Sequence, residues 1–239
     1  MTASEVEKMI GDAPNKTCNF NLDPAPTWLI KEFRRLLSPF VALLINVSFI
    51  TGCFPAKYKH AVVSPLLKKS DADKNELKNY RPVSNLPCLS KLLEKVAQTQ
   101  LQRFLTACDK LPIHQSAYRQ FHSTETTLLT VFNDLLQAAD RGQVSSLCLL
   151  ELTAAFDTVD HKLLVLRLQR SFGIRGYCAD MVHFVLVEQD VLCVPRGVYS
   201  HLIYVTCSVP QGSVLSPLMF LLYTAELAEL AARYGVTLN

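Results

Sequence analysis

Residues 146–161 read SLCLLELTAAFDTVDH, and this stretch carries most of the information about the fold. It opens with the apolar run Ser146–Leu152, which is too short for a helix and is typical of a buried strand. Glu151 interrupts this run near its end. Because burying an unpaired carboxylate costs free energy, we expect Glu151 to be paired, protonated or bound to a metal ion. Residue types alone do not decide whether Glu151 is a structural acid or a metal ligand.

Further along the chain, the turn Val209-Pro210-Gln211-Gly212-Ser213 precedes a long apolar helix expected over Ser213–Tyr234. Pro210 fixes one backbone dihedral and Gly212 permits an unusual one, so Gln211 is predicted to lie on a tight turn. A turn at a helix N-terminus suits contact with a phosphate or nucleotide. The alternative is a helix-entry turn that binds nothing.

The remaining periodicity predicts an α+β fold. Helical spacing of apolar residues is found at Trp28–Ile50, Leu89–Leu105, Leu128–Ala139 and His161–Phe172. Strands are predicted at Ala61–Leu67 and in a hairpin of Val191–Pro195 with Tyr199–Thr206 around Arg196-Gly197. Helices that alternate with a few hairpin strands favour α+β over a doubly wound sheet.

Capping residues mark the ends of these helices. Ser123 can begin a helix that ends at Gly142, and Asp160 can begin the one that ends at Gly173. The helix after Ser123 is expected to face the core with an apolar stripe of Leu128, Phe132, Leu135, Leu136 and Ala139.

Composition excludes several classes of protein. Of 239 residues, 49% are hydrophobic and 19% charged, so the chain can bury a sizeable core and is not wholly disordered. Eight cysteines without a Cys-x-x-Cys pair give a zinc site no support. With no secretory leader, we expect reduced, mostly buried thiols and an intracellular protein, whether nuclear or cytoplasmic. The apolar run Leu36–Ile50 is shorter than the roughly 20 residues of a membrane span and predicts a buried helix, not a membrane partner.

The charge is unevenly distributed. Residues 53–120 carry twelve Lys/Arg against five Asp/Glu, a net charge of +7, whereas residues 121–239 have a net charge of −4. A basic segment beside an acidic one suits a nucleic-acid groove next to a cation site. Ordinary solvated lysines are the alternative.

Five blocks in order and at family spacing resemble the reverse transcriptases of non-LTR (LINE-type) retrotransposons, most closely the chicken-repeat and jockey-like branch. The blocks are Pro65–Lys69, Asn79–Ser84, Gln115–Glu125, Leu150–His161 and Val209–Thr224. The resemblance rests on all five blocks together. The resemblance implies a right-hand polymerase in which residues 23–145 form a fingers-like helical and basic region. Residues 146–239 then form part of the palm, after a loose N-terminal segment over residues 1–22.

The resemblance also implies roles for individual residues. The family uses two magnesium ions in nucleotidyl transfer to a primer 3′-hydroxyl on an RNA template. Glu151 stands at the position of a catalytic aspartate that binds both ions, and the backbone carbonyl of Leu152 matches another ligand. Structural alternatives stand beside these roles, since Asp157 could simply favour a helix start.

Nucleotide contacts follow from the same resemblance. Phe156 matches the aromatic gate that excludes a ribose 2′-hydroxyl, and Arg119 matches the finger arginine that grips the triphosphate. Gln211 and Gly212 match the turn that supports the nucleotide and the template. We expect Arg119, Glu151, Phe156 and Gln211 to converge on one cleft. A core role for Phe156 and a surface ion pair for Arg119 are the alternatives.

Two departures from the family bear on activity. Glu151 replaces the family's aspartate, and a displacement of roughly 1 Å can cost about 100-fold in rate. The third palm block, a Tyr-Ala-Asp-Asp hairpin expected near Gly235–Asn239, is not among the 239 residues, and neither is a thumb. Its aspartates supply the remaining metal ligands, which puts magnesium binding in doubt. We therefore expect a truncated domain that is inactive alone.

Four functional alternatives follow. The chain could be a polymerase fragment that retains nucleotide or nucleic-acid binding, or a decayed element product with no biochemical role. It could instead be a non-enzymatic domain that binds RNA or a protein partner. The last alternative is an enzyme completed by another protein that covers the truncated palm.

Overall fold

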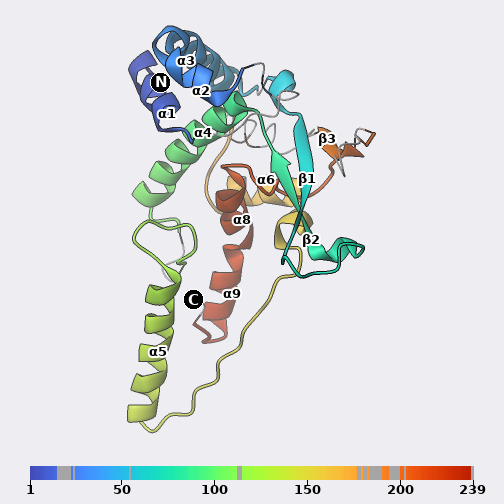
Figure 1. Cartoon of the computed structure of the whole chain (residues 1–239). Helices are drawn as coiled ribbons and strands as arrows, with labels where there is room; N and C mark the ends of the chain where they lie inside the picture. Colours follow the sequence, from blue (N-terminus) through green and yellow to red (C-terminus); the bar gives the residue numbers. More distant parts are fainter. Residues whose placement is uncertain are drawn as a thin grey trace.

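The computed structural model contains helices with a small sheet at one side of them, which confirms the predicted α+β class (Figure 1). It describes residues 1–14, 23, 25–53, 55–111, 115–176, 179, 182, 190–193, 200, 201 and 203–237. The helices are α1 (Ala3–Asp12), α2 (Thr27–Glu32), α3 (Arg34–Thr51), α4 (Cys88–Ala107), α5 (Thr124–Asp140), α6 (His161–Arg170), α8 (Ser216–Thr224) and α9 (Glu226–Arg233). The strands are β1 (Ala61–Leu67), β2 (Tyr80–Asn85), β3 (Asp190–Cys193) and β4 (Ile203–Tyr204). Short 3-10 turns are η1 (Ala56–Tyr58), η2 (Leu77–Asn79) and η3 (Ala155–Thr158).

The sheet has the strand order β2-β1-β3-β4. Strand β1 pairs antiparallel with β2, so that Leu67 faces Tyr80, and parallel with β3, so that Ala61 faces Val191. Strands β3 and β4 pair antiparallel, as the predicted hairpin requires. The strand predicted at Ala61–Leu67 is confirmed, while the predicted turn Arg196-Gly197 lies outside the described residues.

The N-terminal segment is not loose, which corrects the prediction for residues 1–12. Helix α1 begins with a capping box between Thr2 and Glu5, and it buries Val6 and Ile10 in the core. The amino group of Met1 donates a 2.9 Å hydrogen bond to Asn46 on α3. Figure 1 shows α1, α2 and α3 gathered around the N-terminus. Residues 15–22 lie outside the described part.

Helix α3 is buried on one face and exposed on the other. Val41 and Ile45 pack in the core, whereas Leu36, Phe40 and Leu43 are exposed. Among the described helices, α3 alone has the length and apolar composition of a membrane span. The prediction of a buried helix therefore holds for one face of α3.

The core is built mainly by α1, α3, α4, α6 and α8. Leu93 on α4, Leu164 on α6 and Met219 on α8 are among its fully buried members. The single helix predicted over Ser213–Tyr234 is divided at Ala225 into α8 and α9. The cysteines with described side chains are free, and most of them are exposed, so the expectation of mostly buried thiols was wrong for this group.

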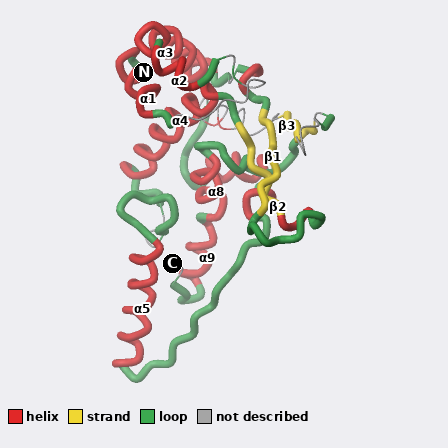
Figure 2. Tube along the Cα trace, in the orientation of Figure 1, coloured by secondary structure: helices red, strands yellow, loops and turns green. Residues whose placement is uncertain are grey.

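Two neighbouring segments differ from the sequence prediction. Residues 146–152 form no strand; they belong to a long exposed loop that follows α5 (Figure 2). Ser123 caps the start of helix α5 as predicted, yet none of the residues of α5 is buried. Its apolar stripe is largely exposed because no other described element covers it. The buried strand at Ser146–Leu152 and the core-facing stripe of α5 are therefore both corrected.

Candidate functional site

A hydrogen-bonded junction joins the segment around Phe156 to the turn that leads into α8. The amide of Val209 donates to the Phe156 carbonyl at 2.8 Å, and the amide of Ser208 donates to the Val159 carbonyl at 2.8 Å. Nε2 of the buried His161 lies 2.6 Å from the Ser208 carbonyl, to which the ring N–H donates. Two segments about fifty positions apart are thereby held in register at this junction.

Strand β2 also contacts this junction, at the turn that contains Gln211 and Gly212. The amide of Ser84 donates a 2.7 Å hydrogen bond to the Gln211 carbonyl. Gly212 has a φ of +125°, and a Cβ at this position would lie 2.4 Å from the Ser84 carbonyl oxygen. Only glycine fits such an approach. The tight turn predicted at Gln211 and Gly212 is therefore confirmed, and its physical cause is the close passage of β2.

The side chain of Gln211 points back to the Phe156 segment. Its Nε2 donates a long 3.4 Å hydrogen bond to Oδ1 of Asp157. Asp157 lies in η3, which begins after Ala154, a residue in the left-handed conformation at φ +52°. The strained residue turns the chain sharply before η3. The junction thus presents one amide and one carboxylate side by side.

Phe156 packs against α8 as well as bordering the junction. Its ring centroid lies 5.1 Å from that of Phe220, with the ring planes tilted by 34°. Such tilted aromatic pairs are stabilising. Phe156 is half-buried, so its ring has a packing role and also an exposed edge.

Glu94 on α4 binds the turn that contains Gln211 and Gly212. This residue was not identified in the sequence analysis. Its side chain is 1% exposed and its Oε2 accepts hydrogen bonds from Ser213 Oγ at 2.8 Å and from the Val214 amide at 2.7 Å. Burial raises the pKa of the Glu94 carboxyl above its usual value, and the bonds from Ser213 and Val214 oppose this shift. The available signal was an acid inside the apolar pattern of α4.

Glu151 and Leu152 lie in the exposed loop and not on a strand. Both line an open pocket of about 700 Å³ whose wall includes Phe220, the ring that packs on Phe156. Within the described residues Glu151 makes no hydrogen bond or ion pair. On the same wall, Arg167 forms a 3.2 Å ion pair with Glu226. The prediction that Glu151 lies at the end of a buried strand was wrong, because this residue is exposed.

The part of the chain that the structure describes has no cluster of three His, Cys, Asp or Glu side chains able to hold a metal ion. Glu151 and the Leu152 carbonyl offer two of the oxygen ligands that Mg²⁺ prefers, but among the described residues Glu151 belongs to no metal-binding group of three His, Cys, Asp or Glu side chains. These residues do not fit a complete two-ion site, and no chemical step can be assigned to metal ions here.

Arg119 lies apart from the junction. It lines a groove along α4, with Tyr118 and Phe121 as neighbours, and its Nη1 donates a 3.5 Å hydrogen bond to the Gln115 carbonyl. Of the four residues expected in one cleft, Phe156 and Gln211 meet at the junction, and Glu151 lines the adjoining pocket. Arg119 lines the groove along α4, which has no lining residue in common with the pocket that Glu151 lines.

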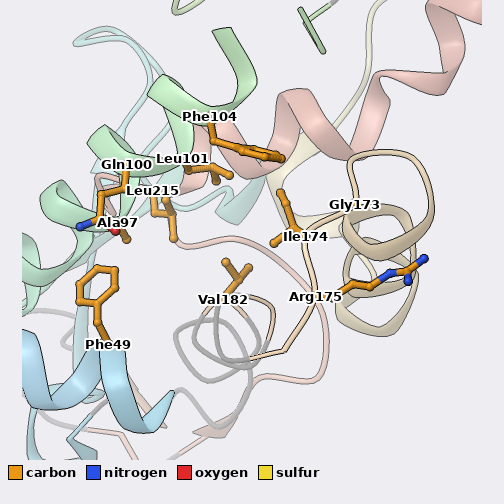
Figure 3. Close-up of a pocket in the computed structure, with 10 residues that line it drawn as sticks. All are labelled: Phe49, Ala97, Gln100, Leu101, Phe104, Gly173, Ile174, Arg175, Val182 and Leu215. Atoms are coloured by element: carbon orange, nitrogen blue, oxygen red, sulfur yellow. The ribbon is translucent and has the colours of Figure 1, made fainter. Parts of the chain in front are cut away.

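A separate apolar pocket of about 350 Å³ lies behind the turn (Figure 3). Phe49, Phe104, Ile174 and Val182 surround it, and Leu215 connects it to the start of α8. Figure 3 shows the Arg175 guanidinium directed away from this space. Its lining offers no pair of groups for acid–base chemistry, so the junction is the better candidate site.

Comparison with known proteins gives a consistent result. Residues 67–238 match the family described as reverse transcriptase (RNA-dependent DNA polymerase). The chain is 30% identical over 213 residues to the probable RNA-directed DNA polymerase from transposon BS of Drosophila melanogaster, covering 89% of this chain and 22% of that protein. It is 29% identical over 234 residues to the RNA-directed DNA polymerase from mobile element jockey of the same species, covering 95% and 24%. The chain thus spans less than a quarter of the length of these relatives.

Proposed function

The chain belongs to the reverse transcriptase family, and from this premise we propose that it forms the fingers and part of the palm of a retrotransposon RNA-directed DNA polymerase. The proposed fingers comprise residues 23–145 and the proposed part of the palm comprises residues 146–239. The nucleic acid that the family implies is an RNA template with its primer.

The junction around Gln211 is the observation that carries this proposal. Three sequence blocks meet there: the segment containing Phe156, the turn at Gln211 and Gly212, and strand β2 through Ser84. The three blocks lie 55 to 127 positions apart in the chain, so only tertiary folding brings them together. A polymerase needs such a convergence to hold template and nucleotide in one geometry.

Each residue at the junction has a proposed task. The turn at Gln211 and Gly212 supports the incoming nucleotide through its backbone, because glycine leaves no side chain in the way. The exposed edge of Phe156 discriminates against a ribose 2′-hydroxyl, while Phe220 fixes the ring. Arg119 grips the triphosphate by the fork of its guanidinium, which requires the turn that carries Arg119 to lie nearer the junction than it does in this structure.

The 239 residues are proposed to be catalytically incomplete by themselves. The family uses divalent metal ions, which activate the primer hydroxyl and neutralise the leaving phosphates. This sequence contains no Tyr-Ala-Asp-Asp segment, and its described acids do not cluster. The longer relatives have room for the missing ligands. A second candidate function, RNA binding without catalysis, is favoured by the net charge of +7 over residues 53–120.

A chimera tests the polymerase proposal. Residues 1–239 with Glu151→Asp are fused to the segment that follows the matched region in the jockey polymerase, and DNA synthesis is measured on an RNA template with a DNA primer. We expect the chimera to synthesise DNA and the unfused chain to synthesise none with magnesium or manganese.

Two variants of the chimera supply the controls. Gln211→Ala should reduce synthesis by about tenfold or more, since the turn loses its bond to Asp157. Gln143→Ala, in the exposed loop, should leave it unchanged. Template-dependent synthesis by the unfused chain that Glu151→Ala abolishes would overturn the proposed incompleteness.

A further inference from the structure

Helix α3 carries a second apolar stripe on the face that points away from the core. Its members recur at alternating intervals of three and four positions, and we call them the α3 seam: Phe33, Leu36, Phe40, Leu43, Val47 and Ile50. Their exposed fractions range from 49% to 71%. The residues that α3 buries, such as Val41 and Ile45, lie on the opposite side of the helix. Figure 1 shows α3 with α1 and α2 at one end of the molecule.

The spacing of the α3 seam is that of a coiled coil. Alternating steps of three and four residues keep side chains on one face of a helix, where they can interlock with a matching helix. A helix that serves only the core of its own chain needs one apolar stripe, and α3 already has that stripe on its buried side. The seam is therefore available to a helix outside the described arrangement.

The α3 seam is large enough for a stable contact. Its six side chains present roughly 600 Å² of apolar surface, which is at the upper end of what a typical monomer exposes in one patch. Two such faces together would bury about 1,200 Å², the lower limit for a specific and stable interface. Polar residues at the rim add to this area.

We propose that the α3 seam binds the α3 seam of a second copy of this chain, so that two chains form a symmetric antiparallel dimer. No Asp, Glu, Lys or Arg occurs between Leu36 and Thr51, so no like charges oppose each other when the seam meets itself. A stripe with this regular spacing is complementary to its own copy across a two-fold axis. The axis passes between Phe40 and Leu43, so that Phe40 packs beside Leu43 of the second copy and Leu36 beside Val47. The inference does not depend on polymerase activity.

The charges at the two ends of α3 favour the antiparallel arrangement. Arg34 and Arg35 lie in the first turn, and Arg35 forms a 3.3 Å ion pair with Glu7, yet its side chain stays 85% exposed. The last turn, which ends at Gly52, has carbonyl groups that carry partial negative charge. Antiparallel packing brings Arg35 of each chain to the carbonyl end of the other, whereas parallel packing brings the cations of both chains together.

A lipid surface is the weaker candidate for this face. Helices that lie on membranes are rich in Lys and Arg along a polar face. Helix α3 has its two cations at one end only, and its other face is buried in the core. A second protein helix therefore suits the seam better than a membrane.

Sedimentation equilibrium on the 239-residue chain tests the dimer. We expect a dimer at about 50 µM, with a Kd in the low micromolar range or below. Phe40→Glu with Leu43→Glu places four carboxylates at the centre of the interface, and it should raise the Kd of the dimer at least about hundredfold.

A matched pair of residues on α5 controls for general effects of the added charge. Leu129 and Phe132 are also three positions apart, and they are 69% and 65% exposed. Leu129→Glu with Phe132→Glu should change the Kd of the dimer by less than about threefold, because α5 lies outside the proposed interface. Circular dichroism shows whether each variant is folded.

A charge exchange tests the orientation. In the antiparallel dimer position 36 faces position 47 of the second copy, so Leu36→Lys with Val47→Glu should form two ion pairs. Leu36→Lys with Val47→Lys opposes like charges at both places. The first double variant should dimerise at least about tenfold more tightly than the second. In a parallel dimer each position faces itself, so both variants would oppose like charges and have equal Kd values.

Three results would overturn the assignment. The first is a chain that stays monomeric up to about 100 µM, and sedimentation of that monomer with phosphatidylcholine vesicles would assign the face to a lipid surface. The second is a dimer that loses as much affinity through the α5 pair as through the seam pair. The third is an equal Kd for the two charge variants, which would exclude the antiparallel arrangement. Failure of the chimera to synthesise DNA would leave this inference untouched, because no step of it involves synthesis.

Discussion

Glu94 shows how one buried carboxylate orders the turn that presents Gln211. Replacing it by alanine leaves the Ser213 hydroxyl and the Val214 amide without their acceptor. We expect Glu94→Ala to lower the free energy of unfolding by about 1–3 kcal/mol for each unpaired group. Glu94→Gln keeps one acceptor oxygen and should cost less. Urea denaturation of both variants gives the comparison, and equal losses would mean that the hydrogen bonds to Glu94 contribute little.

The same residue predicts a dependence on pH. Burial raises the pKa of Glu94 above its ordinary value of 4.5, so the folded chain holds this proton at a pH where the unfolded chain has lost it. The free energy of unfolding should therefore fall as the pH rises from about 4.5 through the folded-state pKa. Glu94→Gln should remove this part of the slope, and Glu229→Gln on the exposed face of α9 should not. Identical slopes in the wild type and Glu94→Gln would contradict the prediction.

Gly212 gives a second prediction for a single residue. Gly212→Ala would place a Cβ 2.4 Å from a backbone oxygen of β2, which cannot move cheaply. Gly142→Ala is the matched control, since Gly142 also has a positive φ but no atom near its missing Cβ. We expect the loss of unfolding free energy at Gly212 to exceed that at Gly142 by about 1–3 kcal/mol. Chemical denaturation measures the unfolding free energy of both variants. Equal losses would contradict the prediction, because they would mean that β2 moves away from the added Cβ at little cost.

Helices α4 and α5 behave differently although both have apolar stripes. Leu93 on α4 is fully buried, whereas Phe132 on α5 is 65% exposed. We expect Leu93→Ala to destabilise the fold by about 2–5 kcal/mol, and Phe132→Ala to change its stability by less than about 0.5 kcal/mol. A large loss at Phe132 in thermal denaturation would show that α5 packs in solution against a surface absent from the described arrangement.

The prediction of a strand at Ser146–Leu152 was wrong because it considered the segment without its neighbours. An apolar run favours an extended backbone, but a strand also needs a hydrogen-bonding partner. Strand β1 finds one in β2, 13 to 23 positions further along the chain, through a local hairpin. The loop after α5 finds none among the described strands, and its apolar side chains stay exposed.

At the scale of the whole molecule, charge predicts how nucleic acid binds. The net charge of +7 over residues 53–120 includes the exposed cations of the β1–β2 hairpin and those of the α4 groove. Affinity for single-stranded RNA should fall steeply between about 50 and 200 mM salt, with a logarithmic slope of about −0.7 per phosphate contact. Titrations at several salt concentrations measure this slope, and a flat response would exclude an electrostatic groove.

Sequence alone determined the features that depend on nearby residues. The caps at Ser123 and Asp160, the left-handed glycines at helix ends and the bounds of β1 were all predictable. The caps and the glycines arise from hydrogen bonds or steric limits within a few positions of the chain, whereas β1 also needs its partner β2, 13 to 23 positions away. Gly212 marked the position of the tight turn, because only glycine adopts its φ of +125° readily, but the close passage of β2 against this turn was decided by tertiary structure.

Tertiary structure decided the rest, because burial and pairing depend on partners far away in the sequence. An apolar stripe does not specify what covers it, so the pattern could not show that α5 stays uncovered while α4 is buried. Family resemblance could not place Arg119 apart from Phe156 and Gln211 in this arrangement. Nor could it identify Glu94, whose role exists only because α4 passes beneath a turn about 120 residues further along the chain. Local interactions determine where elements begin and end, whereas long-range packing determines which side chains meet.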